Sequence, residues 1–129
     1  MRYEAVGRIT REEYEQIIQA TNPARIASAL LSISYWQGDW QWIQDQLLSF
    51  IDHNDYWVRR NVIQGLGHVA RVNGQLDTEK VELVLRSIAA KPLGKEAESE
   101  DEMHLRGAAE DALEDIQIFI HQRNREAQN

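Results

Sequence analysis

The sequence predicts an all-α protein built from about three antiparallel helix pairs that stack side by side. Apolar residues recur at helical spacing along most of the chain, and the alternating pattern of β-strands is nearly absent. Residues 56–69 (YWVRRNVIQGLGHV) also recur in altered form 47 residues later, at 103–116 (MHLRGAAEDALEDI). In this alignment Val62 matches Ala109, so we expect both side chains to be buried. Helical repeats of this length serve as binding surfaces more often than as enzymes.

Size and composition bound the class of protein. A chain of 129 residues is long enough for one domain with a real core, and we predict a single domain over residues 1–129. No run of about 18 apolar residues predicts a membrane span, and the N-terminus lacks the apolar segment of a secretion signal. The absence of cysteine excludes disulfides and thiol catalysis, and a cytoplasmic protein is the simplest interpretation.

Local start signals predict the first two helices. Thr10 and Glu13 form a capping box, which predicts a short helix over residues 10–20. Pro23, directly after an asparagine, predicts a second helix over residues 23–35. The apolar positions of these two helices share helical spacing: Tyr14, Ile17, Ile18, Ile26, Ala29, Leu30 and Ile33.

Two more helices are predicted in the middle of the chain. Asp39 is the expected N-cap of a helix over residues 40–51. Asp55 is the expected N-cap of a helix over residues 56–73, and Gly74 ends it. Their inward-facing residues recur every three or four positions: Trp40, Ile43, Leu47, Phe50, Ile51, Val58, Val62, Leu66, Val69 and Val72.

The last part of the chain predicts two helices and a polar tail. The first of these helices starts at Asp77 or Thr78 and runs to residue 90. A second capping box, Ser99 with Glu102, starts the last helix, which we expect to run to residue 122. Residues 123–129 are polar and are expected to fray.

The turn and helix start around residue 55 carry a family resemblance. Asp55 precedes the pair Val58-Arg59, and apolar residues follow at helical spacing. This pattern resembles the second helix of a HEAT repeat, and Leu105-Arg106 repeats it near the end of the chain. The resemblance implies a HEAT-like α-solenoid, in which the two arginines bond backbone or acidic groups of the adjacent repeat.

A second resemblance rests on the size of the chain and on two segments. These are the aromatic stretch at residues 35–42 (YWQGDWQW) and residues 59–77, which end in Gly-Gln-Leu-Asp. In these features the chain is similar to small bacterial HEAT-like proteins that serve as immunity proteins in contact-dependent growth inhibition and related polymorphic toxin systems. The resemblance implies a cytoplasmic protein that binds and blocks a cognate toxin domain.

The net charge of −7 is concentrated in one segment. Residues 95–115 hold nine acidic and two basic residues, whereas acidic and basic residues balance elsewhere. A local acidic field repels phosphates and anionic membranes and attracts basic proteins. One interpretation is an ordinary solvated helix with its loop, and the other is a patch that binds a basic partner. Neither interpretation favours nucleic acid or a membrane as the partner.

No constellation of residues predicts catalysis. The four histidines lack any recognised ligand spacing, so no metal is expected. The carboxylates at residues 110–115 flank the apolar stripe instead of entering it, and acid–base catalysis needs such groups in a cleft. Gly65 and Gly67 lie inside a predicted helix, so they do not form a nucleotide-binding loop. We therefore expect no enzymatic activity and no cofactor.

In a stack of helix pairs, the second helices line one surface, which we predict to bind the partner. That surface would be mixed in charge at its centre and acidic at one end, and tryptophans beside polar residues are typical of binding hot spots. The predicted partner-binding residues are Trp42, Trp57, Arg60, Asn61, Gln64, His68, Arg71, Glu98, Glu100, Asp101, His104, Asp111 and Asp115. The leading hypothesis is steric blocking of a basic toxin domain, which an acidic surface would attract.

Other functions stay open at this point. The second hypothesis is a general HEAT-type adaptor or scaffold subunit that binds an endogenous protein. Exposed tryptophans also suit a homodimer, or they pack within the chain. A helical-repeat DNA glycosylase is a third class, but it needs a basic groove for phosphates, which the acidic balance argues against. A toxin gene immediately upstream would favour the immunity hypothesis over the adaptor.

Overall fold

The computed structural model describes residues 8–90 and 100–128, and these residues form helices and no β-strand. The prediction of an all-α protein is therefore confirmed for the described residues. The elements are α1 (Arg11–Gln19), α2 (Pro23–Ile33), α3 (Trp40–Ser49), α4 (Tyr56–Asn73), α5 (Thr78–Ala89), α6 (Glu100–Ile116), the π-helix η1 (Gln117–Gln122) and α7 (Arg123–Ala127). Within these ranges no helix combines the length and apolar character that crossing a membrane requires.

Several predicted capping interactions set the helix boundaries. The Thr10 hydroxyl accepts from the Glu13 amide at 3.1 Å, and the Glu13 carboxylate accepts from the Thr10 amide at 3.2 Å. Asp55 Oδ1 accepts from the Val58 amide at 3.1 Å, so it caps α4. Gly74 ends α4 in the left-handed conformation, at φ 66°. Each cap satisfies an amide or carbonyl that the helix leaves unpaired at its end.

The start of α3 differs from the prediction, because Asp39 makes no capping bond with its side chain. An N-cap residue that bonds the first turn has an extended backbone, whereas Asp39 has φ 48°. The turn is instead fastened to the end of α4. Asn73 Oδ1 accepts from the Gly38 amide at 2.8 Å, and Asn73 Nδ2 donates to the Trp36 carbonyl at 2.9 Å.

The C-terminal tail is helical, so the expectation that it frays is wrong for the described residues. α6 continues without a break through η1 into α7. The helical stripe also continues, because Ile116 and Ile120 are both buried. At η1, His121 Nε2 lies 2.8 Å from Glu82 Oε1 of α5, which ties the two helices together. Ser99, the predicted N-cap of the last helix, lies outside the described residues.

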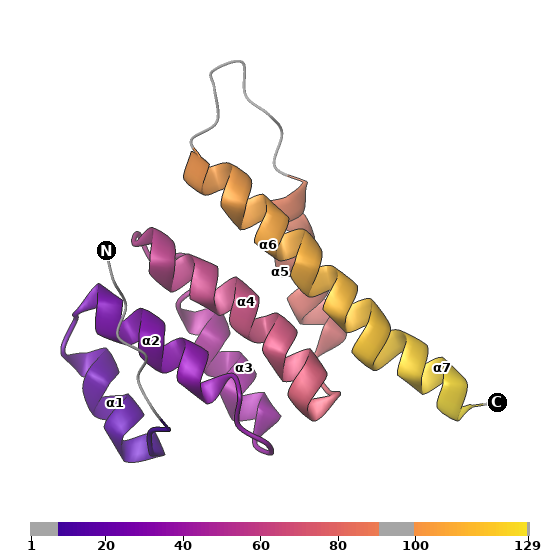
Figure 1. Ribbon diagram of the computed structural model, residues 1–129, viewed down its shortest axis with the longest axis horizontal. Helices are drawn as coiled ribbons and strands as arrows, with labels where there is room; N and C mark the ends of the chain where they lie inside the picture. The colour runs from indigo at the N-terminus through magenta and orange to yellow at the C-terminus, as the bar shows by residue number, and fades with distance from the viewer. Residues whose placement is uncertain (1–7, 91–99, 129) are drawn as a thin grey trace.

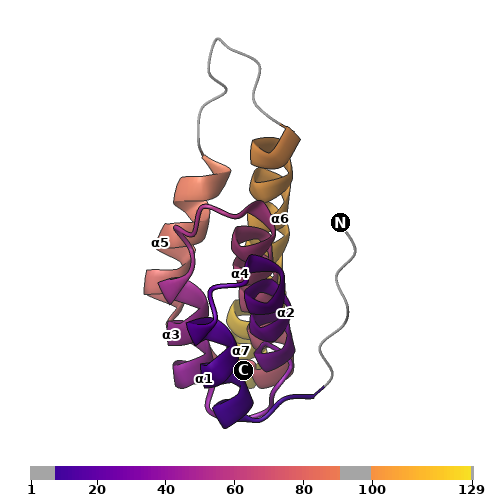
Figure 2. The same cartoon turned by 90° about the vertical axis from the view of Figure 1, so that its left-hand side faces the viewer.

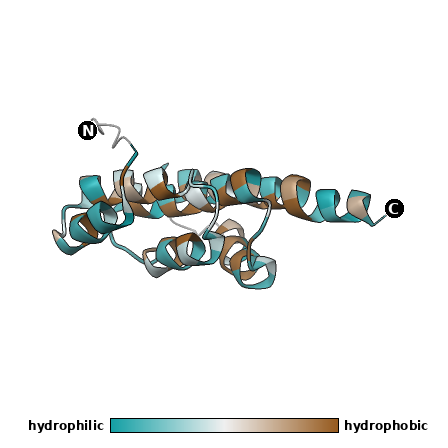
Figure 3. Ribbon diagram, turned by 90° about the horizontal axis from the view of Figure 1, so that it is seen from below, coloured by the Kyte–Doolittle hydropathy of each residue, from teal (hydrophilic) through white to brown (hydrophobic). Residues whose placement is uncertain are grey.

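The helices lie in two layers. α2, α4 and α6 lie side by side in one layer, and α1, α3 and α5 form the other (Figures 1 and 2). Figure 3 shows the rows of helices from below. α4 is central, because it packs against α2 and α6 in its own layer and against α3 in the other. α6 also packs against α5.

A continuous apolar core fills the space where the helices meet. Val62 and Ala109, the pair matched by the internal repeat, are both completely buried, as predicted. Each of the helices α1 to α6 contributes at least one of the largest fully buried side chains. These are Tyr14, Leu30, Ile33, Ile43, Leu47, Ile63, Leu66, Leu85 and Ile116. Burial of each large aliphatic side chain contributes roughly 1.5–3 kcal/mol, so this cluster is the main stabilising feature of the fold.

Two glycines of α4 let neighbouring helices approach closely. A Cβ at Gly65 would lie 3.0 Å from Leu47 Cδ2, so glycine lets α3 and α4 lie close together there. The sequence offered no packing reason for Gly67. In the structure, a Cβ at Gly67 would lie 2.7 Å from Asp115 Oδ2 and 3.5 Å from the Ala112 Cα. Gly67 therefore leaves room for the backbone and a carboxylate of α6.

Gly107 of α6 is a different case, because no atom lies within 4 Å of the position that its Cβ would take. Inside a helix, glycine is less favourable than alanine by about 1 kcal/mol. We expect Gly107→Ala to raise the free energy of unfolding by about 1 kcal/mol and Tm by roughly 3–6 °C. Thermal unfolding followed by circular dichroism measures this shift. An unchanged or lower Tm would contradict the open environment of this residue.

Candidate functional site

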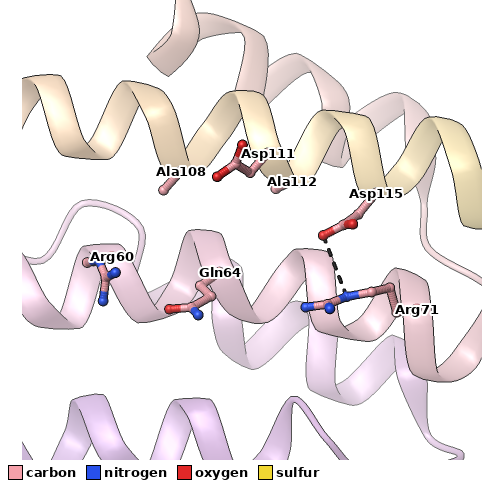
Figure 4. A pocket seen from close by; sticks show the side chains of 7 residues that line it. All are labelled: Arg60, Gln64, Arg71, Ala108, Asp111, Ala112 and Asp115. Atoms are coloured by element: carbon pink, nitrogen blue, oxygen red, sulfur yellow. Dashed lines mark ion pairs between the residues drawn. The ribbon is translucent and has the colours of Figure 1, made fainter.

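A groove with a volume of about 190 Å³ lies between α4 and α6. Three lining residues come from α4 and four from α6 (Figure 4). They are Arg60, Gln64, Arg71, Ala108, Asp111, Ala112 and Asp115. The structure thus brings together five predicted partner-binding residues, namely Arg60, Gln64, Arg71, Asp111 and Asp115.

Helical spacing explains why these side chains meet. On α4 the lining residues are spaced by four and seven residues and so share one face, and on α6 Asp111 and Asp115 are four residues apart. Ala108 and Ala112 lie between the acidic side chains and were not predicted as part of the site. Ala112 lies opposite Gly67, and the small size of these two residues lets α6 lie close to α4. Small residues at helical spacing beside the acids were the sequence signal for this wall.

The two walls of the groove differ in charge. Arg71 Nε lies 3.6 Å from Asp115 Oδ2 across the groove, in an ion pair that is partly exposed. Burial raises the pKa of Asp115, Arg71 opposes that rise, and Asp111 and Glu114 raise it further. The direction of this shift shows that one arginine does not offset the burial and negative charge around Asp115. An exposed pair of this kind contributes only about 0–1 kcal/mol to stability.

Arg60 and Trp57 lie together on α4. The Arg60 guanidinium carbon is 5.3 Å from the Trp57 ring centroid, within the range of a cation–π interaction. Trp57 is half-buried and packs edge-on against Tyr56, with ring centroids 5.1 Å apart. Trp57 is therefore adjacent to a groove residue without lining the groove itself.

Trp42 lies in the other layer, on α3, and packs within the chain. Its ring stacks on Trp36 at 5.9 Å and meets Tyr14 edge-on at 5.4 Å. The Arg11 guanidinium carbon lies 4.3 Å from the Trp42 ring centroid. These contacts join α1 to α3, so Trp42 is separate from the groove and from the surface of the second helices.

Asn61 and His68 are buried, which overturns the expectation that they lie on the surface with Gln64. Only 7% of Asn61 and 3% of His68 is exposed. The reason is that α2 covers this side of α4. Asn61 Nδ2 donates to the Ala27 carbonyl of α2 at 2.8 Å, so its role is to fasten the two helices.

His68 forms a buried polar contact with the end of α2. Its Nδ1 lies 3.1 Å from Ser34 Oγ and its Nε2 lies 3.3 Å from the Tyr35 hydroxyl, whose ring stacks on the imidazole. Ser34 Oγ donates to the Leu31 carbonyl at 2.6 Å, so Ser34 accepts from a protonated Nδ1. Burial, together with the smaller effect of the nearby positive charge of Arg71, lowers the pKa of His68 to about 4. The ring is therefore neutral at pH 7.

This burial predicts a pH-dependent stability. In the unfolded chain His68 takes up a proton near pH 6.5, whereas the folded chain resists protonation down to about pH 4. The contribution of neutral His68 to the free energy of unfolding is therefore fully present above pH 6.5 and is lost as the pH falls to 4. We expect the free energy of unfolding to fall by about 1–2 kcal/mol over this pH range because of His68, after allowance for solvent screening.

The variant His68→Gln isolates that contribution, because the carboxylates titrate in both proteins. Between pH 6.5 and 4, we expect the Tm of the wild type to fall more steeply than that of the variant. Calorimetric scans of both proteins over this range measure the difference. Parallel curves would show that His68 is protonated as easily in the folded chain as in the unfolded one.

The remaining predicted residues lie at the start of α6 or beyond it. Glu100, Asp101 and His104 are exposed on the first turns of α6 and do not line the groove. Glu98 lies outside the described residues. The described acidic residues of α6 therefore form one group at its N-terminus and a second group further along the helix, of which Asp111 and Asp115 line the groove.

The chain is similar to a protein of known structure. No protein-family model matches the chain, and neither does any curated protein. A chain in the crystal structure of a CDI complex from Cupriavidus taiwanensis LMG 19424 is 33% identical, with a TM-score of 0.70. The match covers 92% of this chain and 96% of the other. The chain belongs to the family of this CDI-complex protein. Because the match to the CDI-complex protein spans nearly the whole length of both chains, it is not confined to one helix pair.

Proposed function

We propose that the chain is an immunity protein, which binds and blocks the toxin domain of its own contact-dependent growth inhibition system. The similarity to a protein of a CDI complex carries this proposal, because it extends over 92% of the chain at 33% identity. The acidic net charge suits a basic toxin as the partner. The chain would act in the cytoplasm by occupying a surface of the toxin, with no chemistry of its own.

The fold would be a HEAT-like α-solenoid of three helix pairs, α1 with α2, α3 with α4, and α5 with α6. Two observations support this part of the proposal. The first helices of the pairs share one layer and the second helices share the other (Figure 2). The internal repeat also places buried residues at equivalent positions, as Val62 and Ala109 illustrate.

The partner-binding surface would lie on the layer of second helices, around the groove between α4 and α6. This groove is hollowed and carries charged side chains of both signs, which select a partner with a complementary pattern of charge. Asp111 and Asp115 would contact basic residues of the toxin, and Arg60, Gln64 and Arg71 would contact its polar groups. Trp42, Asn61 and His68 would support the fold.

A growth assay tests the function. The toxin domain encoded beside the gene of this chain is expressed in a sensitive bacterium, alone and together with the chain. We expect the toxin alone to stop growth and the chain to restore it. If the toxin stops growth equally in both cases, the chain is not its immunity protein. Affinity purification from the native cell would then identify the partner of an adaptor.

A further inference from the structure

We propose that the groove between α4 and α6 receives one arginine side chain of the partner, whose guanidinium lies between the carboxylates of Asp111 and Asp115. The inference rests on the proposed function, since the partner is taken to be the toxin domain. The toxin must then carry an arginine on the surface that contacts this groove.

The size of the groove limits what enters it. Its volume of about 190 Å³ is smaller than the roughly 300–1,000 Å³ of pockets that hold drug-sized molecules. A helix or strand of the partner is too large for this space, whereas a single long side chain fits.

The lining of the groove suits a long cationic side chain. Asp111 and Asp115 lie on successive turns of α6 and line the groove, and the Asp115 carboxylate extends toward Arg71 of α4 (Figure 4). Ala108 and Ala112 provide an apolar wall next to them, against which a methylene stem packs while its charged end reaches the carboxylates. The wall opposite contains the neutral Gln64 between Arg60 and Arg71.

The carboxylates have unused capacity to accept hydrogen bonds. Within residues 8–90 and 100–128, neither Asp111 nor Asp115 accepts a hydrogen bond, and Asp111 has no ion-pair partner. Arg71 Nε lies 3.6 Å from Asp115 Oδ2, which is longer than a hydrogen bond. A second cation would relieve the repulsion between the two carboxylates. It would also take the place of the water lost when a partner covers the groove.

The positive side chains of α4 leave space for that cation. Arg60 is held over the Trp57 ring, at 5.3 Å, and so is directed to the aromatic group. Arg71 lies at the other end of the groove and is 46% exposed, so its side chain can adjust. The centre of the groove, beside Asp111, is the part that neither arginine occupies (Figure 4).

The geometry favours arginine over lysine or a metal ion. A guanidinium has five donors in one plane and can bridge two carboxylates, whereas an ammonium is a compact point charge. In the described part of the chain, no three side chains of the metal-ligating types come together. A protein side chain is therefore the better occupant.

The test begins with isosteric variants of the chain, Asp111→Asn, Asp115→Asn and the double variant, and with the toxin domain encoded beside the gene. We expect each single variant to weaken binding by about 10- to 100-fold in isothermal titration calorimetry. Glu110→Gln is the matched control, because Glu110 is exposed on α6 and does not line the groove. Its affinity should stay within about threefold of the wild type.

A double-mutant cycle identifies the partner residue. Each arginine and lysine of the toxin domain is replaced in turn by alanine, and binding to the wild-type chain and to Asp111→Asn is measured. We expect one arginine whose loss weakens binding to the wild type at least about tenfold but has little effect with Asp111→Asn. Replacement of that arginine by lysine should restore only part of the affinity.

The outcomes separate the two proposals. If the toxin binds the wild-type chain but no arginine couples to Asp111, or if a lysine does, the arginine inference is wrong and the function stands. Wild-type-like affinity of the double variant Asp111→Asn/Asp115→Asn would overturn the inference in the same way. If the wild-type chain does not bind the toxin, both proposals fail.

Discussion

Replacement of Leu66 by alanine is expected to lower the free energy of unfolding by about 3 kcal/mol. Leu66 is fully buried on α4, the helix that packs against α2, α3 and α6. The smaller side chain removes apolar contacts and leaves a cavity where the layers meet. Urea unfolding followed by circular dichroism measures the change.

Leu83→Ala is the matched control for this prediction. Leu83 lies on α5 and is 73% exposed, so the same truncation removes little buried surface. We expect it to change the free energy of unfolding by less than about 0.5 kcal/mol. Equal effects of the two substitutions would contradict the assignment of Leu66 to the core.

Reversal of charge in the groove is expected to have the largest effect on binding. In the variant Asp111→Lys/Asp115→Lys, two ammonium groups replace the two carboxylates beside Arg71. The groove then repels a basic partner, so we expect its affinity for the toxin domain to fall by at least about 100-fold. Titration calorimetry at physiological salt measures this loss.

A second charge-reversal variant separates local contact from net charge. Asp45→Lys/Glu126→Lys changes the net charge by the same amount, but these residues lie exposed on α3 and α7 and do not line the groove. Charges far from the contact are screened at physiological salt, so we expect less than about tenfold weaker binding. If both variants weaken binding equally, the groove is not the contact surface.

The helices could be predicted from the sequence because their signals are local. The bounds of α4, Tyr56–Asn73, match the prediction, since Asp55 and Gly74 act within one turn of the residues that they cap. Burial of Val62 and Ala109 followed from the repeat, since equivalent positions in two similar units face the same interior. Asp39 was the exception, because Asn73 of a different helix holds that turn.

The site could be predicted only in part, because it depends on contacts between helices. Helical spacing grouped Asn61 and His68 with Gln64 on one face of α4. Only the packing of α2 against α4 shows that Asn61 and His68 are covered. Likewise, the role of Trp42 depends on how α1 packs against α3. Gly67 needed the position of Asp115 to be explained. Spacing along one helix identifies a face, and the neighbouring helices decide how much of it stays accessible.

Chemical labelling of carboxylates tests the central claim most directly. The chain is treated with a carbodiimide and an amine, alone and in the presence of the toxin domain, and each modified residue is quantified by mass spectrometry. We expect the toxin to protect Asp111 several-fold and to leave Asp45 and Glu126 unchanged. A complex in which Asp111 reacts as fast as in the free chain would contradict binding at the groove, and failure to form any complex would contradict the immunity function.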